Sequence, residues 1–200
     1  MIAIIDYGFG NLRSVQKALE FLGADARITD RAADIADADH VVLPGVGAFR
    51  DAIARLRETG LDQAVLASAR AGKPLLGICL GMQLMYEASE ENGHYAGLGL
   101  LPGSITRLRG GEGLKIPHMG WNRLQTRDCP LFAAGEDPFV YFVHSYCAAA
   151  VDGNTAATCD YGQTFTAAAC RENVLGTQFH PEKSGDAGLN MLKGFIRFQG

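Results

Sequence analysis

Cys79 lies between two glycines in the segment GICLG, residues 77–81. An apolar run precedes this segment and a stretch with helical spacing follows it, which is the strand–turn–helix arrangement of a nucleophile elbow with cysteine in place of serine. The flanking glycines let other backbone approach such a strained turn closely. The N-terminus of the helix favours a thiolate, and the N–H of Leu80 can face the oxyanion formed when a thiolate attacks a carbonyl. We therefore predict a nucleophile at Cys79; the alternative is a buried structural cysteine between packing glycines.

His180 and Glu182 are the candidates for the base and the orienting group that a cysteine nucleophile needs. They come at the end of the strand-like run 174–179 and are two residues apart. In an extended chain their side chains therefore point to the same side, where Glu182 can hold one tautomer of His180 and stabilise its imidazolium form. This pattern alone also fits an exposed His–Glu pair in a loop. Its occurrence in one chain with Cys79 favours the catalytic interpretation.

The remaining histidines carry weaker signals. His118 lies in the segment IPHMGWN and His144 in the segment YFVHSY, and each could equally be a core or turn histidine. His40 and His94 have no supporting context.

Two glycine-containing loops follow predicted strands. The first, at residues 44–47, has the sequence PGVG. Its glycines, Gly45 and Gly47, allow unusual backbone angles, so an N–H near Val46 can serve as a second oxyanion donor; the alternative is a plain turn. The second, at residues 8–10, begins like a dinucleotide-binding fingerprint, but Arg13 stands where the third glycine is required. We therefore predict no nucleotide site there.

Composition excludes several other classes of function. The chain has 200 residues, of which 48% are hydrophobic and 20% charged, with a formal net charge of -4. These values are typical of a globular domain and give no electrostatic reason to expect a nucleic acid or an anionic membrane as partner. We expect no signal peptide, because no basic region precedes the first apolar run and Asp6 interrupts it. Five cysteines without a C-x-x-C pair argue against a zinc site, or any other metal, and against a disulfide framework, and favour a reducing cytoplasm.

Short apolar runs alternate with helical patterns in the first half of the chain. We predict strands at 2–6, 41–43 and 75–79, and helices at 12–22, 49–56, 61–69 and 80–88. Asn11 is the predicted N-cap of the first helix and Gly23 its C′ residue.

The pattern changes after about residue 98. Extended segments follow near 103–108, 114–124, 139–147, 155–160, 164–170 and 174–180, before a closing helix marked by Leu189, Leu192 and Ile196. We therefore expect an α/β, flavodoxin-like three-layer fold with a mostly parallel central sheet, helices on both faces and an antiparallel extension in the C-terminal half. We expect residues 1–200 to form one domain.

Six segments together resemble a known family. They are IDYGFGNL (5–12), LPGVGAF (43–49), GICLGMQ (77–83), IPHMGWN (116–122), YFVHSY (141–146) and GTQFHPEK (176–183). In this order they resemble the class I, triad-type glutamine amidotransferases. The segments at 5–12 and 116–122 narrow the resemblance to the glutaminase subunits of imidazole glycerol phosphate synthases, which act in histidine biosynthesis.

The resemblance implies a chemistry that needs no cofactor. Cys79 attacks the side-chain amide of glutamine, His180 gives a proton to the departing ammonia, and water then releases glutamate from a thioester. The backbone of Leu80, Gly45 and Val46 forms the oxyanion hole. The residues that match glutamine-binding positions are Gly47, Gln83, His144, Ser145 and Tyr146.

The resemblance also implies a partner. Ammonia passes to a cyclase subunit of the (β/α)8-barrel type, which makes imidazole glycerol phosphate and an aminoimidazole carboxamide ribotide. Asn11, Trp121 and Lys183 match positions at that subunit interface. Three alternatives stay open: the glutaminase of another amidotransferase (of anthranilate, aminodeoxychorismate, guanylate or pyridoxal phosphate synthesis), a cysteine peptidase of similar fold, and a non-catalytic flavodoxin-like binding module.

Overall fold

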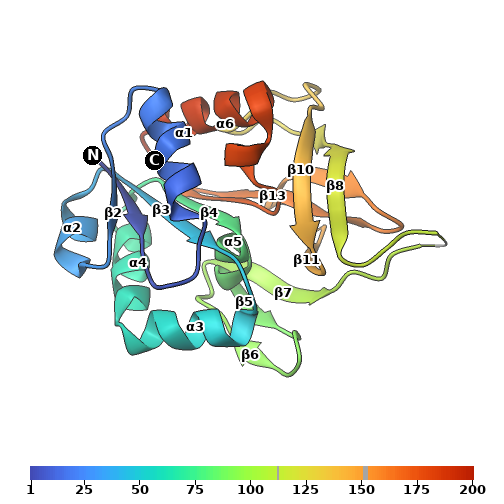
Figure 1. Cartoon of the computed structure of the whole chain (residues 1–200), viewed down its shortest axis with the longest axis horizontal. Coiled ribbons are helices and arrows are strands. Elements are labelled where there is room, and N and C mark those ends of the chain that lie inside the picture. Colours follow the sequence, from blue (N-terminus) through green and yellow to red (C-terminus); the bar gives the residue numbers. More distant parts are fainter. Residues whose placement is uncertain (112, 151–152) are drawn as a thin grey trace.

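A computed structural model describes residues 1–111, 113–150 and 153–200. At its centre, five parallel strands pair in the order β2 (Ala26–Thr29), β1 (Ile2–Ile5), β3 (His40–Gly45), β4 (Leu75–Cys79) and β14 (Val174–Thr177). Every residue of the last four is buried, because helices cover both faces of this part of the sheet (Figure 1).

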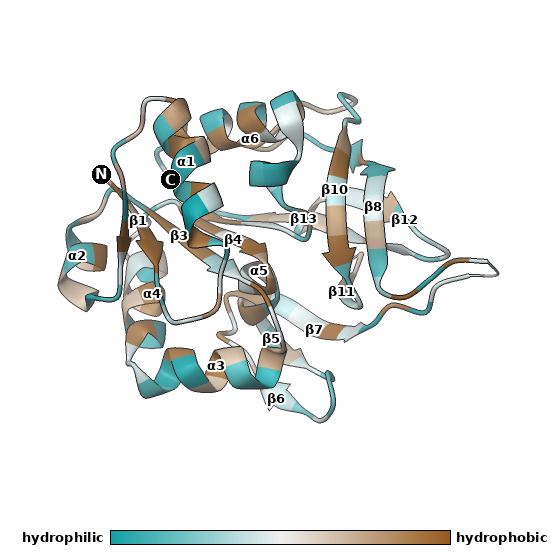
Figure 2. Ribbon diagram, in the orientation of Figure 1, coloured by the Kyte–Doolittle hydropathy of each residue, from teal (hydrophilic) through white to brown (hydrophobic). Residues whose placement is uncertain are grey.

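Alternate residues of the parallel strands face two separate hydrophobic cores. Ile2 and Ile4 pack in the core that holds α1 (Leu12–Phe21) and α6 (Gly185–Arg197). Ala3 and Ile5 point the other way. They share the second core with α2 (Ala32–Asp37), α3 (Phe49–Glu58) and α4 (Leu61–Arg70). Figure 2 shows the resulting layers, with hydrophobic strands between amphipathic helices.

Beyond β14 the sheet continues mainly antiparallel, through β13 (Thr164–Arg171), β11 (Tyr146–Ala149), β7 (Leu101–Arg107), β5 (Tyr86–Ser89) and β6 (Tyr95–Ala96), with β12 (Thr155–Asp160) and β9 (Gln125–Thr126) pairing to one side. A separate two-stranded ribbon consists of β8 (His118–Arg123) and β10 (Phe139–His144). The predicted fold class is therefore confirmed. Among the described residues, no helix is long and apolar enough to cross a membrane.

Some local predictions were wrong. The helix predicted at 80–88 is only α5 (Leu80–Leu84), and the chain then forms β5. Pairing of β5 with β7 and β6 overrides the helical spacing of residues 86–88. Strand β3 also runs on through Pro44 to Gly45, because its pairing with β1 ends at Val42 and no partner there needs the N–H that proline lacks.

The start and end of α1 follow the prediction in part. Asn11 stands at the N-cap position, but its side chain caps no backbone N–H and instead accepts a hydrogen bond of 2.9 Å from the Ser14 hydroxyl. Gly23 follows the helix with φ +84°, as predicted for a C′ residue. The sequence patterns gave no prediction for β2 and α2.

Candidate active site

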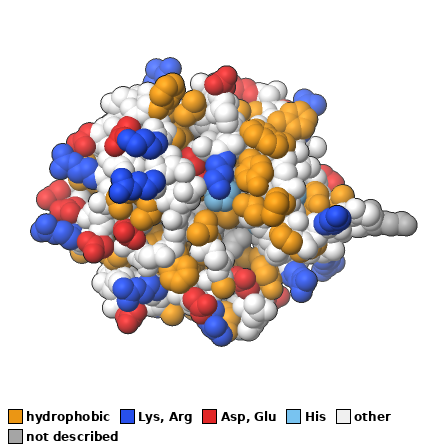
Figure 3. All heavy atoms as spheres, viewed as in Figure 1, with side chains coloured by type: hydrophobic (Ala, Val, Ile, Leu, Met, Phe, Trp, Pro, Cys, Tyr) orange, Lys and Arg blue, Asp and Glu red, His pale blue; other side chains and the backbone are white. Residues whose placement is uncertain are grey.

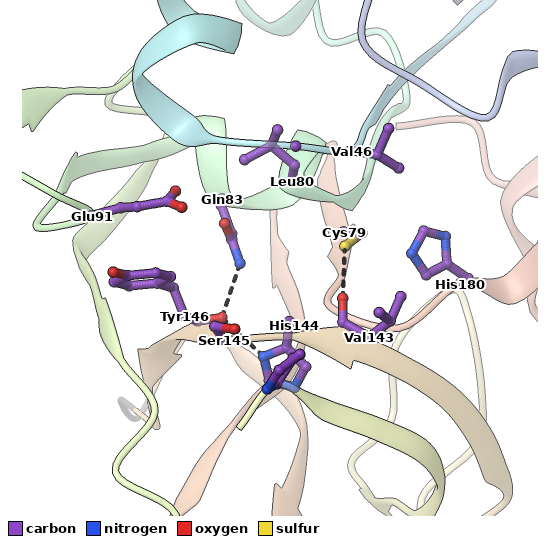
Figure 4. A pocket seen from close by; sticks show the side chains of 12 residues that line it. Val46, Cys79, Leu80, Gln83, Glu91, Val143, His144, Ser145, Tyr146 and His180 are labelled. Carbon is purple, nitrogen blue, oxygen red and sulfur yellow. Dashed lines mark hydrogen bonds between the residues drawn. The ribbon is translucent and has the colours of Figure 1, made fainter. Parts of the chain in front are cut away.

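A cavity of about 410 Å³ opens where β3, β4 and β14 end and where the ribbon meets the sheet (Figure 4). Open α/β sheets bind ligands at this edge. The lining residues are Val46, Gly47, Cys79, Leu80, Gln83, Glu91, Pro117, Val143, His144, Ser145, Tyr146 and His180. The cavity thus brings together candidate residues from four of the six sequence segments described above, and Pro117 from a fifth.

Cys79 is the last residue of β4 and the N-cap of α5. Its φ of +54° and ψ of −112° lie where residues with a side chain are strained, as expected for an elbow. The glycines beside it are required by space: a Cβ on Gly77 would lie 2.7 Å from Cα of Met82, and one on Gly81 would collide with the Leu43 carbonyl. The fold therefore holds the sulfur of Cys79 at a sharp turn that faces the cavity.

His180 follows β14, and its Nδ1 lies 2.8 Å from Oε1 of Glu182. Their side chains are 3% and 1% exposed. The ribbon holds this segment in place, because the N–H of His180 donates to the carbonyl of Tyr141 at 3.0 Å and the N–H of Tyr141 donates to the Ser184 hydroxyl at 3.0 Å. The local i, i+2 geometry predicted for the pair is present.

The other nitrogen of His180, Nε2, is buried and makes no hydrogen bond of ordinary geometry within the described residues. Burial alone disfavours the charged ring, but hydrogen bonding and charge interaction with Cys79 and Glu182 outweigh burial and raise the pKa of His180 to about 10. At neutral pH the imidazole is therefore a cation beside the sulfur, with Nε2 free to give a proton to a bound substrate.

The segment after β3 lies against the elbow. Val46 and Gly47 line the cavity together with Leu80, whereas Gly45 lies behind them, where a Cβ would come within 2.7 Å of the N of Gly81. The phenol of Tyr7 donates a hydrogen bond of 3.0 Å to the carbonyl of Pro44. Burial, and then the charge of Cys79, raise the pKa of Tyr7, which keeps this phenol protonated. The backbone next to the sulfur is thus fixed from the side of β1.

Another wall of the cavity is formed by residues of α5 and β11 that are hydrogen-bonded to each other. The Nε2 of Gln83 donates to the carbonyl of Tyr146 at 2.9 Å, and Nδ1 of His144 also donates to this carbonyl at 2.9 Å. Burial lowers the pKa of His144 to about 4, so its ring is neutral. With Ser145 and Gly47, these residues are the set predicted to hold glutamine, and all of them line the cavity.

The comparisons with known proteins agree with this geometry. The family model for class I glutamine amidotransferases matches residues 3–197. The imidazole glycerol phosphate synthase subunit HisH of Syntrophotalea carbinolica is 53% identical, over 98% of each chain, and that of Oceanobacillus iheyensis is 52% identical, over 96% of each. The chain is a class I glutamine amidotransferase of the HisH family.

Solved structures give the same fold at lower identity. A crystal structure of a glutamine amidotransferase matches with a TM-score of 0.77 and 19% identity, over 98% of this chain and 100% of that one. The structure of PurLQS from Thermotoga maritima matches with a TM-score of 0.74 and 22% identity, over 98% and 96%. The resemblance predicted from the six segments is therefore confirmed at the level of family and fold.

Glu91 lines the cavity of this amidotransferase and was not predicted from the sequence. Its Oε2 accepts a hydrogen bond of 2.8 Å from the N–H of Phe49, at the start of α3. The residue follows β5, which the sequence patterns assigned to a helix, so no local signal could have placed it here. Only the pairing of β5 beside β7 brings this carboxylate to the cavity.

Gln178 was also missed, although a signal was available. Its Nε2 lies 3.7 Å from the sulfur of Cys79. It stands two residues before His180 in extended chain, so the argument that places Glu182 beside His180 also places Gln178 on that side.

The three residues predicted at a partner interface lie on neighbouring elements of the amidotransferase. Trp121 is 54% exposed on β8, Lys183 is exposed in the 3-10 helix η1 (Pro181–Lys183), and the half-buried Asn11 precedes α1. Helix η1 contacts both α1 and β10, which places these elements side by side. Figure 3 shows hydrophobic side chains gathered over the ribbon on this face.

Proposed function

We propose that this amidotransferase hydrolyses glutamine at the 410 Å³ cavity and supplies the ammonia to a cyclase subunit of imidazole glycerol phosphate synthase. The observation that carries the proposal is the buried His180–Glu182 pair in one cavity with the strained Cys79. A nucleophile, a charged proton donor and an orienting carboxylate are the parts that acyl transfer to a thiol requires.

The reaction divides into two steps. In the first, the thiolate of Cys79 adds to the side-chain carbonyl carbon of glutamine, and Nε2 of His180 gives its proton to the departing nitrogen, so that ammonia leaves and a thioester remains. In the second, His180 takes a proton from water, the hydroxide adds to the thioester, and the thiolate returns as glutamate leaves. Backbone N–H groups of Leu80 and Val46, which line the cavity, are proposed to bind both oxyanions, and each donor is worth about 3–4 kcal/mol.

Recognition of glutamine follows from the charges around the cavity. The α-ammonium group of glutamine needs an anion, and Glu91 is the one carboxylate among the lining residues. Gln83, Ser145 and Tyr146 present polar groups for the carboxylate and amide. His144 also lines the cavity. Because its ring is neutral, it places no positive charge beside the glutamine carbonyl that Cys79 is proposed to attack.

The proposed docking face for the cyclase is the outer side of the ribbon. Met119 is 61% exposed, Trp121 54% and Phe139 60%, and the rings of Trp121 and Tyr141 lie edge to face with centroids 6.1 Å apart. A cluster of exposed aromatic residues is typical of a protein interface. We propose a (β/α)8-barrel subunit as occupant and a heterodimer in the cytoplasm, with Asn11 and Lys183 at the edge of the interface.

Glutamate release tests the proposal. Wild type should release glutamate from glutamine, weakly alone and faster with the cyclase subunit, and Cys79→Ala should release none under either condition. No release by wild type with the cyclase subunit present would overturn the proposal. Cleavage of peptides without any dependence on glutamine would favour a peptidase instead.

A matched pair of variants tests the partner. Trp121→Ala should weaken binding to the cyclase subunit by about 30-fold or more, as for a central aromatic interface residue. Phe21→Ala is the control, because Phe21 is 77% exposed at the end of α1 and has no part in the proposed face. Equal affinities of the two variants, measured by calorimetry, would place the interface elsewhere.

A further inference from the structure

A continuous path of hydrogen bonds runs from the ribbon to the sulfur of Cys79. In order, its members are Asn122, His118, His144, the carbonyl of Tyr146, Gln83, Gln178 and Cys79. His118 and Gln178 are 0% exposed, and Gln83 and His144 are 5% and 6% exposed. Water is therefore largely excluded from the path, and each polar group depends on its neighbour in the chain of contacts.

The outer half of the path consists of two imidazoles. Nε2 of His118 lies 2.8 Å from the Asn122 side chain, and Nδ1 of His118 lies 3.0 Å from Nε2 of His144. Nδ1 of His144 lies 2.9 Å from the carbonyl of Tyr146. The inner half consists of two amides. Nε2 of Gln83 donates to the same carbonyl and to Oε1 of Gln178, both at 2.9 Å.

The chemistry of these groups permits one direction of donation. A carbonyl only accepts, so Nδ1 of His144 carries the hydrogen. Burial lowers the pKa of His144 and of His118, so both rings are neutral. Nε2 of His144 then accepts from Nδ1–H of His118. Oδ1 of Asn122 stands 2.8 Å from Nε2 of His118, and a turn of this amide by 180° presents its NH2 to that nitrogen, which the neutral ring leaves as an acceptor.

The donors and acceptors of the two glutamine amides determine the last contact of the path. Gln83 uses its NH2 for Tyr146 and Gln178, so Oε1 of Gln178 must accept. The NH2 of Gln178 is then left to point at the sulfur of Cys79, 3.7 Å away. Without the acceptor at Tyr146, Gln83 could turn, and the amide of Gln178 could reverse and present its oxygen to a thiolate.

We propose that His118 and Gln178 are positioning residues for the nucleophile: the path holds the Gln178 amide with its N–H toward the sulfur, where it stabilises the thiolate. This inference rests on the proposed role of Cys79 as nucleophile. It gives a function to His118, which the sequence left as either a core or a turn histidine. It also joins two parts of the cavity in one hydrogen-bonded unit. These are the wall proposed to contact glutamine and the Gln178 amide that faces the sulfur.

A packing role for His118 is the alternative. Its ring stacks on Tyr161 with centroids 3.9 Å apart and on Phe142 at 4.8 Å. Two variants separate the roles. His118→Leu keeps an apolar side chain of similar bulk but has no hydrogen-bond donor for His144. In His118→Asn, the side-chain NH2 takes the place of Nδ1–H and can still donate to His144. Gln178→Met removes the last donor and keeps the length of the side chain.

The test is the rate at which iodoacetamide alkylates Cys79 in the full-length chain, followed from pH 5 to 10 on the Cys79 peptide. His180 and Tyr7 are the ionisable groups whose pKa the charge of Cys79 affects, and both stay unchanged in all the variants. At pH 7 we expect Gln178→Met to react about tenfold more slowly, with its profile displaced to higher pH, because it loses the hydrogen bond to the charged sulfur. His118→Leu should change rate and profile in the same direction, because His144 loses the partner that holds it at the outer end of the path. His118→Asn should react within about twofold of wild type if the donor is restored.

Wild-type rates and profiles in both His118→Leu and Gln178→Met would overturn the inference. Equal slowing in His118→Asn and His118→Leu would assign His118 to packing. Should His118→Leu fail to fold, Asn122→Leu and Gln178→Met decide in its place. Alkylation needs no glutamine, so a chain that shows these effects but releases no glutamate would contradict the proposed function and not this inference.

Discussion

Nδ1 of His180 faces Oε1 of Glu182 across 2.8 Å, with both side chains almost fully buried. The contact keeps a hydrogen on Nδ1 in both the charged and the neutral ring and leaves Nε2 for the reacting atoms. In Glu182→Gln the amide NH2 can turn toward Nδ1 and favour the opposite tautomer. We expect glutamate release to fall about 100-fold or more, with the fold intact. Steady-state kinetics with the cyclase subunit present measures this, with the exposed Glu172→Gln as control.

The charge on His180 can be measured directly. Cys79 and Glu182 together raise the pKa of His180 from 6.5 to about 10 against the opposing effect of burial. Its ring resonances should therefore not titrate between pH 6 and 8 in wild type, and should titrate at lower pH in Cys79→Ala, as followed by NMR of histidine-labelled protein.

The raised pKa also predicts how stability depends on pH. The folded state holds this proton more tightly than the unfolded chain, so the stabilisation is complete below pH 6.5 and is lost progressively as pH rises toward 10. Urea unfolding at pH 7 and pH 9.5 should show a larger loss of stability in wild type than in Cys79→Ala. Equal losses in the two proteins would contradict the assigned interaction.

Glu91 should act on binding of glutamine and not on the chemical step. In Glu91→Gln the amide oxygen can still accept the hydrogen bond from Phe49, so α3 keeps its contact, but the negative charge is lost. We expect KM for glutamine to rise about tenfold or more while kcat changes little, because the α-ammonium group lies away from the scissile amide. A fall in kcat at unchanged KM would show that Glu91 does not bind this group.

Gly81 should be irreplaceable for packing. A Cβ there would collide with the Leu43 carbonyl of β3, and backbone on a central strand cannot move aside. We expect Gly81→Ala to lower the free energy of unfolding by about 3 kcal/mol or more. Gly23→Ala is the control. A Cβ on Gly23 would have open space around it, so only the φ of +84° opposes this substitution, and that backbone strain costs about 1–2 kcal/mol. Thermal unfolding compares the two.

The residues proposed as a triad could be singled out from the sequence because the signals for them are local. The Cys79 elbow needs only a buried strand, two glycines and a helix start, which neighbouring residues specify. His180 and Glu182 are paired by the two-residue repeat of extended chain. The same rule, applied once more, would have found Gln178. Alternating strands and helices likewise gave the fold class, because a strand buried on both faces is apolar throughout.

Other features depend on which strands are neighbours, and no local pattern determines that. The pairing of β4 with β14 brings His180 to a sulfur 101 positions earlier in the chain. The placement of β5 beside β7 turns an expected helix into a strand and carries Glu91 to the cavity. The pairing of His144 with His118 across the ribbon joins two buried rings that looked unrelated in the sequence. The sequence by itself indicated the family, through six short segments, and the candidate nucleophile and base, since an elbow and an extended i, i+2 pair are short-range geometry. The tertiary structure decided that the residues expected to hold glutamine line one cavity with Cys79, and it alone placed Glu91 there and formed the path to the sulfur, because such contacts form only when distant segments pack together.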